Sequence, residues 1–178
     1  MWGEDNKKAV ASKINYYIGR GELYHIRRGI YARDKDYDRF ELATRIFVPS
    51  YISFETVLIR SAINFQFYSQ IFLASYQSRE LAIDGQKYIF KKIKHPILTN
   101  NVGVEFRDQT SIAGPERAFL DVIYINKEYH FDNLNSLNWE KVFEILPIYA
   151  NKRMEKRVDL LMKHYKKNEC WQKTRIKK

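Results

Sequence analysis

The chain has 178 residues, 45% of them hydrophobic and 29% charged, and its net charge is +10. This length and balance suit one domain, or a small domain joined to a larger one, and exclude a chain that is disordered throughout. No run of about 18 uncharged apolar residues is present to cross a membrane. The first residues are acidic rather than those of a secretory signal, and Cys170 is the single cysteine, so we expect a cytoplasmic protein with no membrane partner.

The positive charge is concentrated near the two ends of the sequence. Residues 141–178 contain twelve Lys or Arg against four Asp or Glu, and residues 1–40 contain nine against six. A basic excess of this size favours a polyanionic partner, and nucleic acid is the commonest one in a cytoplasm. A solvated tail that only aids solubility remains the alternative for the C-terminal excess.

The first predicted elements are a helix and a basic hairpin. Apolar residues recur at helical spacing, which predicts a helix over residues 6–18 that ends at Gly19-Arg20-Gly21. Residues 23–32 predict two short strands that turn at Arg28-Gly29. A helix followed at once by a basic hairpin is the second half of a winged helix, whose helix enters the major groove of DNA. The apolar positions of the helix are Val10, Ile14, Tyr17 and Ile18.

We expect this module to contact DNA through the helix face opposite the apolar stripe and through the hairpin. Helix residues on that face must meet solvent or a partner, and an asparagine there suits bidentate hydrogen bonds to adenine. A solvated basic face is the alternative. The apolar stripe must itself be covered, by the rest of the chain or by a second subunit in a homodimer. The candidate DNA-binding residues are Lys8, Ser12, Asn15, Tyr16, Arg20, Arg27 and Arg28.

The remaining periodicity predicts helices alternating with a few strands. The predicted helices cover residues 40–47, 52–63, 115–125, 139–146 and 151–165. The predicted strands cover residues 71–76, 81–83, 88–93 and 102–106, with an Asp84-Gly85 turn between the second and third. We therefore expect an α+β fold: a partial N-terminal winged helix in residues 1–35, then residues 36–178 as a mixed helix and antiparallel-sheet domain with C-terminal helices and a basic tail.

Three strings of the sequence resemble one family. They are residues 21–32 followed by Phe40-Glu41-Leu42-Ala43, residues 49–58, and residues 112–121, where the string is IAGPERAFLD. Together they resemble the AbiEi family of antitoxins, which belong to type IV toxin–antitoxin systems linked to abortive phage infection. The matching strings span about residues 15–135, which is most of the chain.

The resemblance implies a winged-helix DNA-binding module followed by an antitoxin domain. It implies two partners: operator DNA of the protein's own operon, which it represses, and a nucleotidyltransferase-like toxin, which it counters generally without a lasting complex. It also implies roles for the signature residues of the second and third strings, which are Pro49, Ser50, Tyr51, Glu55, Glu116, Arg117 and Asp121.

The sequence contains no recognisable catalytic constellation. The four histidines are scattered without the spacing of a zinc site, and no glycine-rich phosphate loop is present, so we expect no catalytic residues, no metal and no cofactor. Two other mechanisms stay open: an antitoxin enzyme that phosphorylates its toxin, and an antitoxin that neutralises its toxin in a direct complex.

Some signature residues also have a simple structural interpretation. Pro49 is expected to stop one helix, and Ser50 or Ser53 to cap the next by accepting its free amide hydrogens. An ion pair between Arg117 and Asp121, four residues apart on a helix surface, would add only about 0.2–0.5 kcal/mol.

Overall fold

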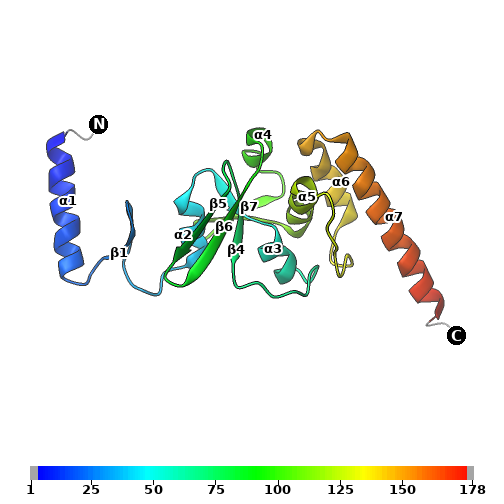
Figure 1. Ribbon diagram of the computed structural model, residues 1–178, viewed down its shortest axis with the longest axis horizontal. Helices are drawn as coiled ribbons and strands as arrows, with labels where there is room; N and C mark the ends of the chain where they lie inside the picture. The colour runs from blue at the N-terminus through cyan, green and yellow to red at the C-terminus, as the bar shows by residue number, and fades with distance from the viewer. Residues whose placement is uncertain (1–3, 176–178) are drawn as a thin grey trace.

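The computed structural model describes residues 4–175 and contains two sheets and a series of helices (Figure 1). The helices are α1 (Glu4–Gly19), α2 (Arg39–Ile46), α3 (Glu55–Arg60), α4 (His95–Leu98), α5 (Pro115–Ile125), α6 (Trp139–Ile145), the 3₁₀ helix η1 (Leu146–Tyr149) and α7 (Lys152–Arg175). The strands are β1 (Tyr24–Arg27), β2 (Ile30–Ala32), β3 (Ser50–Ile52), β4 (Ile71–Ser75), β5 (Arg79–Ile83), β6 (Gln86–Lys92), β7 (Val104–Arg107) and β8 (Thr110–Ala113).

A six-stranded sheet forms the centre of the body, in the order β5-β6-β4-β3-β8-β7. The α+β class predicted from the sequence is confirmed, but the sheet is mixed rather than antiparallel. Strand β4 runs parallel to β6, and β3 runs parallel to β8, while the other three pairings are antiparallel. Hydrophobic patterning indicates where strands occur but not which strands become neighbours, because pairing depends on segments far apart in the sequence.

Helices cover both faces of this sheet. Helix α2 packs on β3, β4 and β8, whereas α3 and α5 pack on each other and on the opposite face (Figure 1). Helix α5 is the most deeply placed helix: Ala118, Phe119 and Val122 are all fully buried, as their spacing predicts. Helix α6 packs on α5, and α7 lies outside α6 (Figure 1).

The segment before α3 differs from its prediction. Ile52, the first residue of the helix predicted over 52–63, is instead the last residue of β3, and α3 covers only Glu55–Arg60. The expected serine cap is wrong, because α3 has no side-chain cap, Ser50 lies in β3, and Ser53 is buried and bonded elsewhere. Since residues 51–58 are all buried, strand pairing satisfies backbone groups that no solvent can reach.

The hairpin turns follow local chemistry. The predicted turn between β5 and β6 is confirmed, with Asp84 and Gly85 at φ angles of 46° and 76°, as a type I′ turn requires. Strand β8 was not predicted. It pairs with β7 through Asp108 and Gln109, which also have positive φ angles but lack the glycine that marks such a turn in a sequence.

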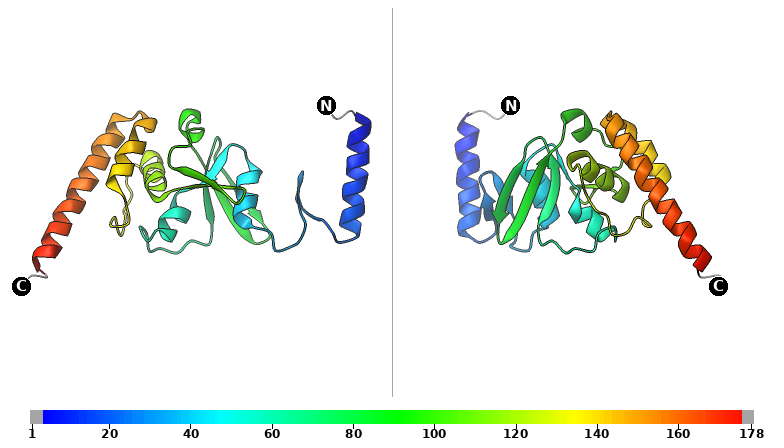
Figure 2. Two further views of the ribbon diagram at one scale, coloured as in Figure 1. Left: turned by 180° about the vertical axis from the view of Figure 1, so that it is seen from behind. Right: turned by 45° about the vertical axis from the view of Figure 1, so that its right-hand side comes forward.

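The two ends of the described chain project from opposite sides of the body (Figures 1 and 2). Helix α1 and the β1–β2 hairpin lie at one end, and α7 extends beyond the body at the other. The body does not cover the apolar stripe of α1, because Val10 and Tyr17 remain 41% and 45% exposed. Among the helices of residues 4–175, none combines the length and apolar character needed to span a membrane.

Candidate functional site

Helix α1 presents the predicted polar face to solvent. Lys8, Ser12 and Asn15 are exposed, and Tyr16 is 57% exposed. Arg20 donates from Nη1 to the Tyr16 hydroxyl at 2.8 Å and pairs through Nε with Glu22 at 2.6 Å. The Arg20 guanidinium is therefore partly neutralised, and it holds the Tyr16 ring on the polar face.

The β1–β2 hairpin supplies the second group of candidate residues. Arg28 is exposed at the turn and Arg27 is half-buried at the end of β1, while Gly29 takes a φ of 81° that favours glycine. Within the described chain neither arginine forms an ion pair. Residues 7–33 contain seven Lys or Arg and one acidic residue, so α1 and the hairpin place a strongly basic segment at one end of the molecule.

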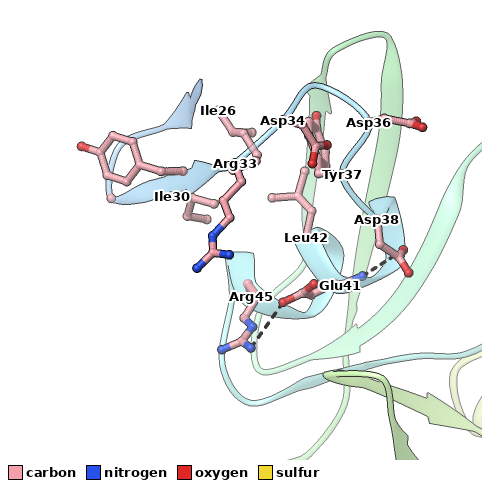
Figure 3. Close-up of a pocket in the computed structure, with 13 residues that line it drawn as sticks. Ile26, Ile30, Arg33, Asp34, Asp36, Tyr37, Asp38, Glu41, Leu42 and Arg45 are labelled. Carbon is pink, nitrogen blue, oxygen red and sulfur yellow. Dashed lines mark hydrogen bonds and ion pairs between the residues drawn. The ribbon is translucent and has the colours of Figure 1, made fainter. Parts of the chain in front are cut away.

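A cavity of about 750 Å³ separates this hairpin from α2 (Figure 3). Ile26, Ile30 and Leu42 form its apolar wall, and Arg33 points toward Arg45 (Figure 3). Its full lining also includes the carboxylates Asp34, Asp36, Asp38 and Glu41. Because the lining carries both positive and negative side chains, it favours neither an anionic nor a cationic ligand. The sequence could not reveal the cavity, because the cavity forms between separate elements.

Three signature residues meet inside the body in a fully hydrogen-bonded cluster. The Asp121 carboxylate accepts from the Tyr51 hydroxyl at 3.0 Å and pairs with Arg117 Nε at 3.4 Å. The hydroxyls of Ser53 and Tyr149 donate to the same carboxylate at 2.7 and 2.6 Å. Sequence analysis did not assign Ser53 or Tyr149 to this cluster, since no local pattern connects them with α5.

Arg117 joins α5 to α4 and to the segment between α4 and β7. Its guanidinium donates to the carbonyl oxygens of Ile97, Asn100 and Val102 at 2.7, 3.2 and 2.7 Å. Gly103, at a φ of 74°, leaves room for this approach, because a Cβ there would lie 3.0 Å from the Arg117 Cβ. The side chains of Arg117 and its partner in the ion pair are 0% exposed, so the weak surface pair expected from the sequence is in fact a buried one.

Burial also controls the ionisation of the cluster. It raises the pKa of the Asp121 carboxyl above its ordinary value, although Arg117 and the three hydroxyl donors act in the opposite direction. Burial raises the pKa values of Tyr51 and Tyr149 well above the usual phenol value, and the neighbouring carboxylate adds to the effect. Both tyrosines therefore stay neutral and serve as hydrogen-bond donors.

The two signature glutamates have structural partners as well. Glu55 accepts two hydrogen bonds from Lys91 Nζ, at 3.0 and 2.9 Å, and this ammonium also lies over the rings of Phe54 and Phe72. Glu116 Oε1 accepts from the backbone amide of Asn138 at 3.0 Å and so anchors the start of α6.

Only the beginning of the second signature string reaches the surface. Pro49 is exposed and Ser50 half-buried, and both line a cavity of about 370 Å³. Val48 and Phe106, which also line this cavity, are 73% and 69% exposed. An apolar rim of this kind suits contact with another protein.

The chain matches no protein-family model, and no curated protein is significantly similar to it. Within the part of the chain that the structure describes, no three His, Cys, Asp or Glu side chains are grouped so that they could hold a metal ion.

Proposed function

We propose that this protein is a cytoplasmic AbiEi-like antitoxin that binds the operator of its own operon through α1 and the β1–β2 hairpin. In this proposal it represses that operon and counters a nucleotidyltransferase-like toxin. The three strings of the sequence that resemble the family are the basis for the antitoxin assignment.

One observation carries the DNA-binding part of the proposal. The most basic stretch of the described N-terminal half is exposed, projects from the body, and consists of a helix followed by a hairpin. Arginines at the hairpin suit contacts to backbone phosphates, and Asn15 and Tyr16 on α1 suit contacts to base edges.

The proposal gives the protein no catalytic step of its own. The polar signature residues on α5 are enclosed in a hydrogen-bonded cluster, with Arg117 and Asp121 fully buried. Groups that already have partners and lack access to solvent suit a scaffold that holds the body together. This favours an antitoxin without a catalytic step over one that phosphorylates its toxin.

The test is a double substitution in the hairpin. Arg27→Ala with Arg28→Ala should weaken binding to operator and scrambled duplexes about equally, because phosphate contacts carry no sequence information. Two lost phosphate contacts should flatten the slope of log K against log salt by about 1.8. The measurement is a titration of both duplexes at about 50 mM and about 200 mM salt.

The control is a second pair of exposed arginines outside the N-terminal module. Arg79→Ala with Arg107→Ala removes the same charge and should leave both affinities and the salt slope nearly unchanged. If the hairpin variant binds the operator as the unmodified protein does, the assignment of DNA binding to this end is wrong.

The exposed apolar rim favours a second candidate mechanism, direct contact with the toxin. Val48→Asp and Phe106→Asp would each place a charge on that rim without touching the buried cluster. Co-elution of toxin and antitoxin in size-exclusion chromatography that these substitutions abolish would favour the direct complex. Toxin neutralisation in cells that survives both substitutions would exclude it.

A further inference from the structure

The orientation of α7 on the body is fixed by its first half. Met154 and Val158 are 4% and 0% exposed and belong to the core. Asn151 Oδ1 caps the helix by accepting from the backbone amides of Arg153 and Met154 at 3.1 and 3.2 Å. Further along, the Tyr165 ring lies 5.9 Å from that of Trp139. One face of α7 is therefore held inward, and the opposite face points to solvent.

That outward face carries a row of lysines. Lys152, Lys156 and Lys163 are all exposed and follow one another at helical spacing, and we call them the outer row. At 1.5 Å of rise per residue, the outer row covers about 16 Å of helix. Asp159 is the one acidic residue in line with them, and within the described residues none of the three lysines forms an ion pair.

The chemistry of this face favours the phosphates of a duplex over other anionic partners. A helix that binds a membrane surface turns a broad apolar face toward the lipid, but Met154 and Val158 of α7 are buried against the body, and among its described side chains Leu160, at 57%, is the one exposed large apolar residue. Single-stranded nucleic acid is held by stacking on exposed aromatic rings, and the outer row has none among its neighbours on the helix. Regularly spaced ammonium groups without base-reading side chains suit backbone phosphates.

The position of α7 decides how such binding relates to the N-terminal module. The outer row and α1 lie at opposite ends of the molecule, with the six-stranded sheet between them (Figure 2). They do not form one continuous surface, so a short duplex bound at one end leaves the other end free.

We propose that the outer row of α7 is a second DNA-binding surface, which contacts duplex phosphates without sequence preference. One molecule then holds an operator at the N-terminal module and a second duplex segment at α7. This inference rests on the proposed DNA-binding function, because bridging requires that the N-terminal module hold an operator duplex while α7 holds the second duplex.

The first experiment weakens the N-terminal module so that the contribution of α7 can be measured. In a protein that already carries Arg27→Ala and Arg28→Ala, α7 should supply a larger share of the residual affinity for a short scrambled duplex, beside the contacts that α1 still makes. Adding Lys152→Glu, Lys156→Glu and Lys163→Glu should then lower that affinity at least tenfold. Replacing the same three lysines with glutamine keeps good helix formers and adds no negative charge near Asp159. This glutamine variant should flatten the slope of log K against log salt by about 2.7.

A matched set of substitutions controls for net charge. Arg79→Glu, Lys87→Glu and Lys92→Glu change the charge by the same amount at exposed positions of β5 and β6. The proposal is overturned if this control weakens binding as much as the outer-row variant. It is also overturned if the glutamine variant binds as tightly as its parent.

The second experiment measures bridging in the full chain. Unmodified protein added to an immobilised operator duplex should capture a second, labelled scrambled duplex, and the outer-row glutamine variant should bind the operator but capture none. Capture of anionic phospholipid vesicles in place of the duplex would overturn the proposal in favour of a membrane surface. If the unmodified protein does not bind the operator, the proposed function is wrong. The first experiment still tests α7 in that case, because it uses a scrambled duplex and no operator.

Discussion

At the scale of single residues, the Arg117–Asp121 pair is best understood beside a surface pair of the same design. Glu41 and Arg45 on α2 are also four residues apart and also 3.4 Å apart, but their side chains are 43% and 53% exposed. Water screens the α2 pair, whereas the α5 pair has no solvent to replace a lost partner. The same spacing in a sequence therefore corresponds to two different energetic roles.

This contrast gives a residue-scale prediction. Asp121→Ala should lower the free energy of unfolding by about 3–5 kcal/mol, because it leaves the Arg117 guanidinium buried without its carboxylate. Glu41→Ala, the matched control, should change it by less than about 1 kcal/mol. Urea denaturation followed by circular dichroism measures both values.

A double substitution tests the physical reason. Arg117→Met added to Asp121→Ala should recover part of the loss, because the unpaired buried charge is removed. If Asp121→Ala and Glu41→Ala lowered the free energy of unfolding by equal, small amounts, the structural role assigned to the cluster would be contradicted.

At the scale of elements, α1 and α5 differ in how each is stabilised. Helix α5 is surrounded by the core and by α3 and α6. The half-buried side chains of α1 are Ile14 and Ile18, and the rest of its residues from 7 to 17 are exposed. Most of the stability of a helix in a protein comes from the packing of its apolar face rather than from intrinsic propensity, so α1 depends on packing that the body does not supply.

We therefore expect fast amide hydrogen exchange in α1 and slow exchange in α5. Local opening requires little free energy where few apolar contacts must break. Mass spectrometry of exchanged peptides from residues 7–18 and 115–125 compares the two helices directly. Operator DNA should slow exchange in α1 and leave α5 unchanged; protection of α1 in the free monomer would show that another surface already covers it.

At the scale of the whole molecule, the body should fold without the N-terminal module. The buried core begins at Leu42, and the elements before it contribute only partly buried side chains to it, Ile26 and Ile30. A fragment of residues 36–178 should therefore keep a cooperative thermal transition close to that of the full chain. Loss of cooperative unfolding in the fragment would mean that the hairpin is part of the body.

Alkaline pH should destabilise the whole body. Burial raises the pKa of Tyr88 to about 12, and burial together with a hydrogen bond to Asp84 raises the pKa of Tyr37 to about 12. Each of these phenols has a higher pKa in the folded state than its value of about 10 in the unfolded chain. Its contribution to stability is therefore fully present below about pH 10 and is lost as the pH rises toward about 12. Tyrosines whose pKa is raised in the same direction are Tyr51, Tyr129 and Tyr149.

The measurement is the urea midpoint as a function of pH. It should fall steeply between about pH 10 and about pH 12, in step with the rise of phenolate absorbance. A midpoint that stays constant over this range would contradict the buried, neutral state of these phenols.

The sequence by itself determined features that depend on neighbours along the chain. Apolar spacing predicted α2, α5 and the first half of α7, and turn chemistry predicted the Asp84-Gly85 hairpin, because these signals act over a few residues. The same periodicity predicted that Lys8, Ser12 and Asn15 face away from the apolar stripe of α1, and these residues are exposed.

Only the tertiary structure decided features that depend on distant partners. The sequence predicts a helix from Ile52, but in the structure β4 and β8 lie beside Ile52, and the Ser53 amide donates to the carbonyl oxygen of Phe72 in β4. Ser53 and Tyr149 join the Arg117–Asp121 cluster from segments 68 and 28 residues away from Asp121. Burial decides the energy of such contacts, and a sequence pattern four residues long carries no information about which surface will cover it.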